Sequence, residues 1–478
     1  MAIEIRTLDG GTFAVDSAEG EAELRMTFRG RVLAPVDAGY DEARLVFNGM
    51  FDKRPGLIIQ CSGVADVVDA VTLANTHQLV TAVRGGGHSI AGFSTCDGGL
   101  VIDLSTMRGV WVDEERRIVR VEGGATWGDV DRETQRVGLV VPGGVISTTG
   151  VSGLTLGGGL GWVHRKFGLS CDSLRAVDLV LADGRLVRAS ESENAELLWG
   201  LRGGGGNFGV VTAMEFDAHP MGPIVMDATV VYPIDTANTV VRAWRDWALT
   251  VPDEVTTRAL IWTFPAAEGL PPAIHDQEVV IIASVYAGDA DEGERVLGPT
   301  RELGTPLADL SMQAPFRFVQ AGFDPFFAKG VLSSYWKSLY MAALTDEAID
   351  FVVKVGTERL SPLTLIHIPM MGGAVSSVGA ADTAFGERSA PFMLSIDGNW
   401  TDRSDDARQI AWVREVIAGA ERFGTGQTYL NFSGADDGGP ESGALAAAFG
   451  ANLKRLQVLK EKYDPTNLFR LNNNITPG

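Results

Sequence analysis

The chain has 478 residues, of which 45% are hydrophobic and 21% are charged, a composition typical of a folded globular protein with roughly two to four domains. Its formal net charge of -21 repels nucleic acid and anionic membranes, so we expect neither as a partner. No apolar stretch reaches the length of a membrane span, and the first residues lack the basic and apolar pattern of a signal peptide.

The cysteines and histidines restrict the chemistry further. Three cysteines without CxxC spacing (Cys61, Cys96 and Cys171) suggest no disulfide framework, which favours a reducing compartment and a cytoplasmic protein. The six histidines are scattered without HxxxH or HExxH pairing, so we expect no catalytic metal.

Short strands alternate with helices in the first half of the chain. Residues 64–78 carry valines at helical spacing, and residues 126–138 predict a second helix with Thr126 as its N-cap. Residues 178–190 predict a hairpin that turns at Asp183 and Gly184. Further strands are predicted at 79–83, 99–105 and 117–124. This alternation predicts an α+β or α/β domain over about residues 45–220.

The pattern changes after Pro220 and Pro223. Apolar runs rich in β-branched and aromatic residues predict strands of one larger sheet with a face turned to a cavity: TVVYP, TRALIWTF, EVVIIASVYAG, LTLIHIPMM and PFMLSIDGNW. Near the end, Leu453, Leu456 and Leu459 predict a helix. A segment rich in glycine precedes this tail, which we expect to return to the first domain.

Three glycine-rich loops lie in the first half, at 84–89, 150–162 and 202–209. Consecutive glycines let backbone N–H groups converge on a phosphate where side chains would clash. Each loop alone could be an ordinary tight turn, but three loops, with a histidine closing the first, favour a dinucleotide site. The GGGLG run at 157–161 departs from the GxGxxG turn of a nicotinamide-dinucleotide site, so we do not expect NAD.

Taken together, four groups of motifs resemble one known family. The sequence is similar to the vanillyl-alcohol-oxidase-type flavoproteins, specifically the berberine-bridge-enzyme-like branch. The motifs that carry this similarity are VRGGGHS with AGFS and GLVIDLS, then PGG…TTGVSGLTLGGGLGW, then RGGGGNFGVVT and finally YDPTNLFRLNNNI. The similarity spans about residues 40–215 and 425–477.

The resemblance implies an α+β fold with an FAD-binding domain of two subdomains, of the PCMH type. It also implies a substrate domain with a mainly antiparallel sheet flanked by helices. We expect the FAD-binding domain at 1–220 with its core at about 50–220, the substrate domain at 221–440, and a C-terminal segment, 441–478, that returns to the FAD domain.

The implied FAD contacts come from the three loops and the tail. By resemblance they are Arg84, Gly85, Gly86, Gly87, His88, Ser89, Gly92, Phe93, Gly143, Gly144, Thr148, Thr149, Gly150, Gly153, Gly157, Gly158, Gly161, Trp162, Gly209, Val210, Val211, Asn472 and Asn474.

His88 occupies the position that, in this family, is joined through a ring nitrogen to the flavin 8α carbon. A neutral imidazole is a suitable nucleophile for such a bond. Many relatives add a second link from a cysteine, but Ile146 stands at that position, so we expect a single covalent bond. The alternatives are a histidine that binds phosphate and a flavin held without a covalent bond.

The expected function is oxidation of an alcohol, sugar, amine or natural-product intermediate, with hydride passing to flavin N5 and O2 as the expected electron acceptor. The accompanying proton needs a base. Tyr429 is the first candidate, by resemblance to the family's YxN(Y/F) strand. His367, in LTLIHIPMM, is a weaker candidate, and either residue could instead be a packing residue.

The rival functions are a dehydrogenase with another electron acceptor and a flavoprotein that sequesters a ligand. The substrate and the oligomeric state stay open.

Overall fold

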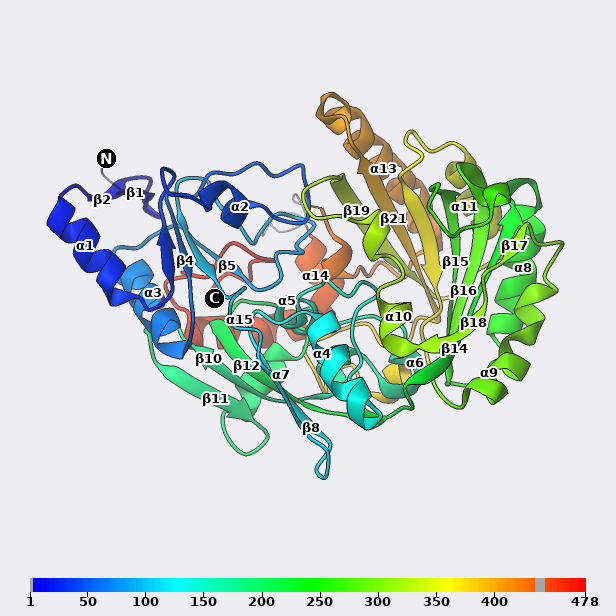
Figure 1. Ribbon diagram of the computed structural model, residues 1–478, viewed down its shortest axis with the longest axis horizontal. Coiled ribbons are helices and arrows are strands. Elements are labelled where there is room, and N and C mark those ends of the chain that lie inside the picture. Colours follow the sequence, from blue (N-terminus) through cyan, green and yellow to red (C-terminus); the bar gives the residue numbers. More distant parts are fainter. Residues whose placement is uncertain (1–2, 435–442) are drawn as a thin grey trace.

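The computed structural model describes residues 3–434 and 443–478. Figure 1 shows two lobes side by side, the first built from the N-terminal half and the C-terminal tail and the second from the central part of the chain. Among the described residues, the first lobe contains a four-stranded and a five-stranded sheet together with two small two-stranded sheets, and the second lobe contains one eight-stranded sheet.

A four-stranded sheet of order β3-β4-β6-β5 organises the first part of the first lobe. Strands β4, β6 and β5 run parallel, and α3 (Val64–Thr76) forms the crossover between β4 and β5. This helix ends two residues before Gln78, whose backbone is left-handed with φ 49. The other elements here are β1 (Ile3–Arg6), β2 (Thr12–Val15), α1 (Ala18–Thr27), β3 (Arg31–Leu33), α2 (Tyr40–Arg44), β4 (Leu57–Gln60), β5 (Thr81–Arg84) and β6 (Leu100–Asp103).

An antiparallel sheet of order β11-β10-β12-β8-β7 organises the second part of the first lobe. The predicted N-cap is confirmed, since Thr126 and Asp129 form a capping box at the start of α4. The predicted hairpin is confirmed as β10 and β11, with Gly184 at φ +81 in the turn. The elements are β7 (Val110–Asp113), β8 (Ile118–Glu122), α4 (Trp127–Thr134), β9 (Leu139–Val140), α5 (Val151–Leu156), α6 (His164–Phe167), β10 (Leu174–Val180), β11 (Leu186–Ser190), α7 (Ala195–Leu201), β12 (Val210–Asp217) and β13 (His219–Pro220).

The second lobe is built on an eight-stranded sheet of order β17-β14-β16-β15-β20-β21-β19, with β18 paired to β14, and every strand pair in it is antiparallel. Its elements are β14 (Ile224–Pro233), α8 (Ala237–Ala248), β15 (Val255–Phe264), β16 (Gln277–Tyr286), α9 (Ala290–Leu297), β17 (Ala308–Asp309), β18 (Met312–Pro315), α10 (Phe316–Gln320), β19 (Ser333–Met341), α11 (Asp346–Thr357), β20 (Leu365–Pro369), α12 (Ala374–Ser377), β21 (Phe392–Trp400) and α13 (Asp406–Ala420). The α+β fold with a mainly antiparallel second sheet is confirmed.

The two faces of this sheet have different neighbours. Along β15, Ala259 and Ile261 belong to the core shared with α8, α11 and α13. The alternate residues Leu260 and Trp262 belong to a second core that also contains aromatic residues from the first lobe, such as Trp162. The helices therefore cover one face, and the other face is turned toward the first lobe (Figure 1).

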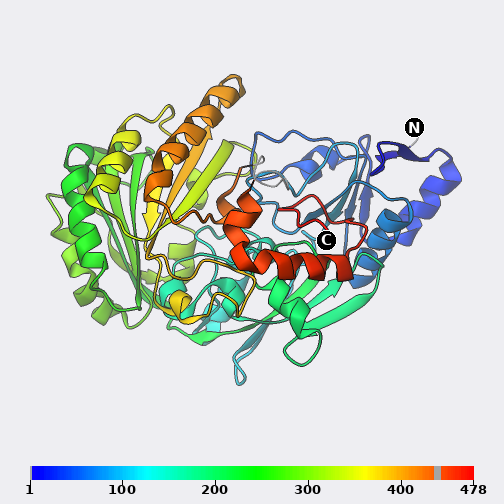
Figure 2. The ribbon, with the colours of Figure 1, turned by 180° about the vertical axis from the view of Figure 1, so that it is seen from behind.

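The C-terminal tail lies on the first lobe, as Figure 2 shows from behind. It contains α14 (Ala444–Phe449) and α15 (Leu453–Tyr463). Leu456 and Leu459 are buried in the core of the antiparallel sheet of that lobe. The fully buried Lys460 Nζ donates to the carbonyls of Asn207 and Phe469, each at 2.9 Å. The boundary expected at 440/441 and most of the glycine-rich segment before it lie outside the described residues.

Candidate active site

A cavity of about 310 Å³ lies where the two lobes meet. The first lobe supplies the glycine loops around residues 85–93, 144–157 and 203–209 together with Asn472 and Asn473 of the tail. The second lobe supplies side chains from the sheet face opposite its helices: Arg258, Leu260, Trp336, Leu365, His367 and Asp397. A single cavity thus joins the loops expected to bind FAD with the expected substrate sheet.

The first two glycine loops touch through their backbones. A Cβ added to Gly86 would lie 2.5 Å from the Cα of Gly150, and a Cβ added to Gly150 would lie 2.4 Å from the backbone nitrogen of Gly86. No side chain fits at either position without moving the backbone. Glycine is required here by the close approach of the loops, in agreement with the sequence interpretation.

Several polar atoms of the residues that the first lobe contributes to the cavity wall are unpaired. Asn472 donates from its amide nitrogen to the Gly206 carbonyl at 3.1 Å, yet its amide oxygen has no hydrogen-bond partner among the described residues. Within the same described part of the chain, the Asn473 oxygen and the Ser94 hydroxyl also have none. Buried polar atoms are rarely left unpaired, so these atoms fit a polar cofactor at this wall.

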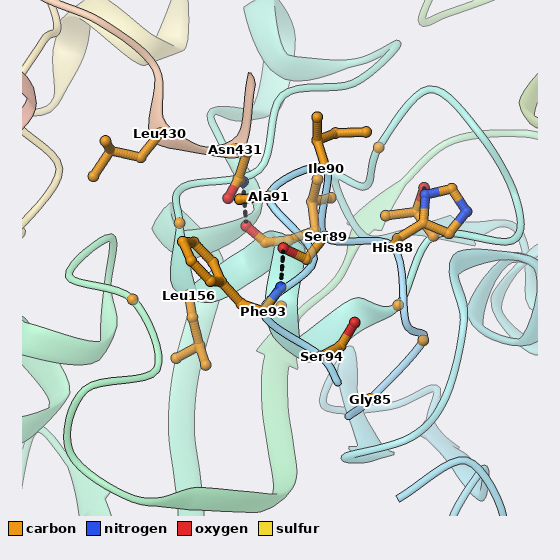
Figure 3. A pocket seen from close by; sticks show the side chains of 18 of the residues that line it. Gly85, His88, Ser89, Ile90, Ala91, Phe93, Ser94, Leu156, Leu430 and Asn431 are labelled. Carbon is orange, nitrogen blue, oxygen red and sulfur yellow. Dashed lines mark hydrogen bonds between the residues drawn. The ribbon is translucent and has the colours of Figure 1, made fainter. Parts of the chain in front are cut away.

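His88 lies at the cavity wall beside Ser89 and Ile90 (Figure 3). Its ring stacks on Phe47, with the ring centroids 4.0 Å apart. The Nε2 atom lies 3.0 Å from Thr148 Oγ1, and Nδ1 lies 3.5 Å from Thr149 Oγ1. Burial, and to a lesser extent the positive charge of Lys329, lower the pKa of His88 to about 3, so the ring is neutral at physiological pH.

Ile146, at the position that the resemblance assigns to a second cysteine anchor in many relatives, is an apolar side chain. It lines the cavity and packs in the same core as Phe47, Ile90 and Trp162. The three cysteines are buried and free, and of the residues that the structure describes at the cavity wall none is a cysteine.

Tyr429 lies behind the cavity wall, with its hydroxyl held by other protein groups. This oxygen accepts from the backbone N–H groups of Gly159 at 3.1 Å and Leu160 at 3.2 Å, and from the Asn431 amide at 2.9 Å. Burial raises the pKa of Tyr429 to about 12. These contacts tie Tyr429 to Gly159 and Leu160 at the junction of the lobes.

The wall next to Tyr429 is formed by Leu430, Asn431 and Phe432. Leu430 and Asn431 lie across the pocket from His88 in Figure 3. The strand expected here is wrong: residues Leu430–Phe432 form a 3-10 turn, closed by the Phe432 N–H donating to the Tyr429 carbonyl at 2.9 Å. The turn breaks the alternation of a strand and places Phe432 at the wall.

His367 and Asp397 face the cavity from neighbouring strands β20 and β21. His367 Nε2 lies 3.3 Å from Asp397 Oδ2, and Asp397 Oδ1 accepts from Ser395 Oγ at 2.5 Å. Both side chains are buried, and neither ring nitrogen of His367 has a partner with hydrogen-bond geometry in the described part of the chain. The pair is thus a carboxylate and an imidazole whose nitrogens stay available to a ligand.

Fifteen of the sequence-predicted site residues line the cavity: Gly85, Gly86, Gly87, His88, Ser89, Phe93, Gly144, Thr149, Gly150, Gly153, Gly157, Gly209, Val211, His367 and Asn472. Arg84 does not, because its guanidinium pairs with buried Asp103, Nη2 to Oδ2 at 2.5 Å and Nε to Oδ1 at 3.1 Å. The others outside the described wall are Gly92, Gly143, Thr148, Gly158, Gly161, Trp162, Val210, Asn474 and Tyr429.

Neither Arg258 nor Asp397 is among the site residues predicted from the sequence. Arg258 was recognisable as a charge inside an apolar strand, and Asp397 as an acid inside another, but the face on which each side chain lies depends on strand register. Within residues 3–434 and 443–478, no group of three or more potential ligands could hold a metal ion, and no helix combines the length and apolarity needed to cross a membrane.

Comparison with known proteins identifies the family. The family model "FAD binding domain" matches residues 55–190, and the model "Berberine and berberine like" matches residues 428–476. The uncharacterized FAD-linked oxidoreductase YvdP of Bacillus subtilis (strain 168) is 30% identical over 458 residues, covering 94% of this chain and 98% of that protein. The chain belongs to the FAD-linked oxidoreductases, in the berberine-bridge-enzyme-like branch.

Other members of the family cover almost the whole chain. Xylooligosaccharide oxidase of Thermothelomyces thermophilus is 28% identical over 496 residues, covering 97% of this chain and 95% of that protein. The structure of 6-hydroxy-D-nicotine oxidase from Arthrobacter nicotinovorans matches with a TM-score of 0.83 and 25% identity, covering 95% of this chain and 99% of that one. The predicted family and fold are confirmed, and the protein is an FAD-dependent oxidoreductase.

Proposed function

We propose that this FAD-linked oxidoreductase carries its flavin on a single covalent bond from His88 and oxidises an alcohol, sugar, amine or natural-product intermediate, with O2 as the final electron acceptor. The observation that carries the proposal is the single cavity that joins His88 to the His367–Asp397 pair. The names of two relatives, a xylooligosaccharide oxidase and a 6-hydroxy-D-nicotine oxidase, support a sugar or an amine as the substrate class.

The contacts of His88 favour Nδ1 as the atom that bonds the flavin. Thr148 Oγ1, at 3.0 Å, can accept a hydrogen bond from a protonated Nε2, which leaves the lone pair on Nδ1. The low pKa of His88 keeps the ring neutral and nucleophilic. Phe47, stacked on the ring, fixes its plane.

His367 is the proposed base. FAD, when bound, would supply a hydride acceptor for the substrate carbon, and the proton of the substrate hydroxyl or amine must pass to a protein group. His367 has a free ring nitrogen at the cavity wall, and Asp397 beside it stabilises the imidazolium that forms. Tyr429 is assigned a positioning role instead, since its hydroxyl already accepts three hydrogen bonds.

The function is tested by anaerobic mixing of the yellow protein with a panel of alcohols, sugars and cyclic amines. We expect at least one compound to bleach the flavin absorbance and air to restore it with formation of H2O2. Bleaching that only an artificial dye reverses would instead establish a dehydrogenase. Tight binding of compounds without any bleaching would establish a protein that sequesters its ligand and would contradict the proposal.

A further inference from the structure

Arg258 is a charged side chain on the cavity face of an otherwise apolar strand. It lies in β15 in register with Pro369 of β20, two residues before Leu260, which is in register with His367. Arg258 and His367 therefore belong to the same face of adjacent strands, and both line the cavity. Arg258 is only 3% exposed.

The guanidinium of Arg258 is positioned by an aromatic ring and not by an acid. Its Cζ atom lies 4.3 Å from the centroid of the Trp162 ring, which is a cation–π contact. The Trp162 indole in turn donates to the Val145 carbonyl at 3.4 Å. This stacking leaves the edge of the guanidinium, where all of its N–H donors lie, free to face a ligand.

Two of the three guanidinium nitrogens of Arg258 lack partners in the described part of the chain. Neither Nε nor Nη2 has a hydrogen-bond acceptor among those residues. Other buried arginines differ: Arg84 pairs with Asp103, and Arg388 donates to both oxygens of Asp172 at 2.8 and 2.7 Å. Burial lowers the pKa of Arg258 to about 10, against the opposing effect of Asp397, and the group stays cationic at neutral pH.

Asp397 acts on Arg258 through its charge but makes no ion pair with it in the described part of the chain. A buried cation whose donors contact no acid is costly unless a bound anion completes it. A carboxylate matches the fork of a guanidinium with two parallel hydrogen bonds. The cavity wall around Arg258 is largely apolar and aromatic: Leu260, Phe323, Phe327, Trp336, Leu365 and Phe432. A ligand that satisfies both features has an anionic end and an apolar body.

We propose that Arg258, held by Trp162, binds the carboxylate of the substrate, and that the substrate class is an aromatic or alicyclic carboxylic acid with an oxidisable alcohol or amine carbon. The inference rests on the proposed function, because it assigns the substrate of the same cavity. With the carboxylate on Arg258, the apolar body extends along the sheet face toward His367, where the proton is removed.

Binding of simple probes to the flavin-loaded protein tests this inference without any need for turnover. Benzoate is compared with benzamide, its neutral isostere, by the perturbation of the flavin spectrum. We expect benzoate to bind about 10- to 100-fold more tightly, as charge-assisted hydrogen bonds give. Equal affinities for the two probes would overturn the inference.

Variants identify the group responsible. Arg258→Met should abolish the preference for benzoate and leave benzamide binding unchanged, and Arg258→Lys should retain part of the preference because it keeps the charge but loses the fork. The control is Arg185→Met, which removes the same charge from an exposed hairpin and should bind both probes like the natural protein. The comparison of the two probes on the natural protein decides the question even if Arg258→Met fails to fold.

Two outcomes contradict the inference in different ways. A changed flavin reduction potential in Arg258→Met, with the benzoate preference intact, would place the guanidinium against the cofactor. A lower melting temperature with the preference intact would make Arg258 a structural residue. Failure of the proposed function is separate, since it appears as flavin that no compound bleaches while benzoate still binds selectively.

Discussion

His88 is neutral in the folded protein, and this has a consequence for flavin attachment. The pKa of a histidine lowered to about 3 means that the folded protein favours the neutral ring, so the ring is almost fully neutral from pH 8 down to pH 5. For an ordinary histidine with a pKa near 6.5, the neutral fraction at pH 5 would be about 30-fold smaller than at pH 8. We therefore expect the rate of FAD attachment to apoprotein to be nearly flat between pH 5 and pH 8. Fluorescence of denatured protein on a gel, followed over time at each pH, measures this rate, and a steep fall below pH 6.5 would contradict it.

We expect substitutions of His367 and Asp397 to lower kcat by different amounts. His367→Gln removes the proposed base and should lower kcat about 100- to 10,000-fold, the usual contribution of a positioned base. Asp397→Asn leaves the base in place but removes the charge that stabilises its protonated form, so its loss should be smaller. Flavin absorbance per protein should equal that of the natural protein in both variants. A His367→Gln variant with full kcat would exclude it as the base.

For Tyr429 we expect a substitution to lower the stability of the fold more than it lowers activity. Tyr429→Phe removes the acceptor for the N–H groups of Gly159 and Leu160, which should lower the free energy of unfolding by about 1–3 kcal/mol. Activity should stay within about tenfold, the effect of a small shift in position. Urea unfolding and steady-state kinetics on the same preparation check both expectations, and a loss of kcat as large as that of His367→Gln would restore Tyr429 as the base.

Individual residues differ in how far the sequence could predict their place in the site. His88 and Ile146 were recognisable because the motifs around them fix the local backbone. The motif singled out Tyr429 but did not indicate that Phe432 lies at the wall, since the expected strand is a 3-10 turn and a turn changes which side chain reaches the wall. The partners of a buried hydroxyl, such as Gly159 and Leu160, lie 270 residues and 269 residues away in sequence and leave no local signal.

Among the elements, the contact of the first two glycine loops is the feature most sensitive to change. Gly86→Ala would place a methyl group 2.5 Å from the Cα of Gly150 and push the loops apart. We expect this variant to lose most of its bound flavin. The matched control is Gly222→Ala, where an added Cβ meets nothing within 4 Å. Flavin absorbance per protein compares the two, and full flavin content in Gly86→Ala would show that the loops need not touch.

The sequence predicted the elements of the first lobe more closely than the cavity face of the second lobe. The helix at α3 and the hairpin of β10 and β11 were confirmed because periodicity and turn residues are local signals. Strand β19 went unnamed, since three serines and a lysine interrupt its apolar residues. Arg258 acquires its meaning only from the pairing of β15 with β20, which sequence alone does not fix.

At the scale of the molecule, the site exists because two lobes and the tail come together. The glycine loops come from the first lobe, His367 and Arg258 from the sheet of the second, and Asn472 from the tail. The net charge of -21 gave no indication of a buried cation that selects an anion. The division of the chain at 1–220, 221–440 and 441–478 stays a prediction, which limited proteolysis could examine.

The proposed single attachment of FAD at His88 is tested most directly by the mass of the peptide that contains this residue. Protein purified with its flavin is denatured, digested and analysed by mass spectrometry, with His88→Ala treated in the same way. We expect one peptide that carries the mass of FAD on His88 and no second attachment site, and no flavin-bearing peptide from the variant. An unmodified His88 peptide from a yellow preparation, or FAD on another residue, would contradict it.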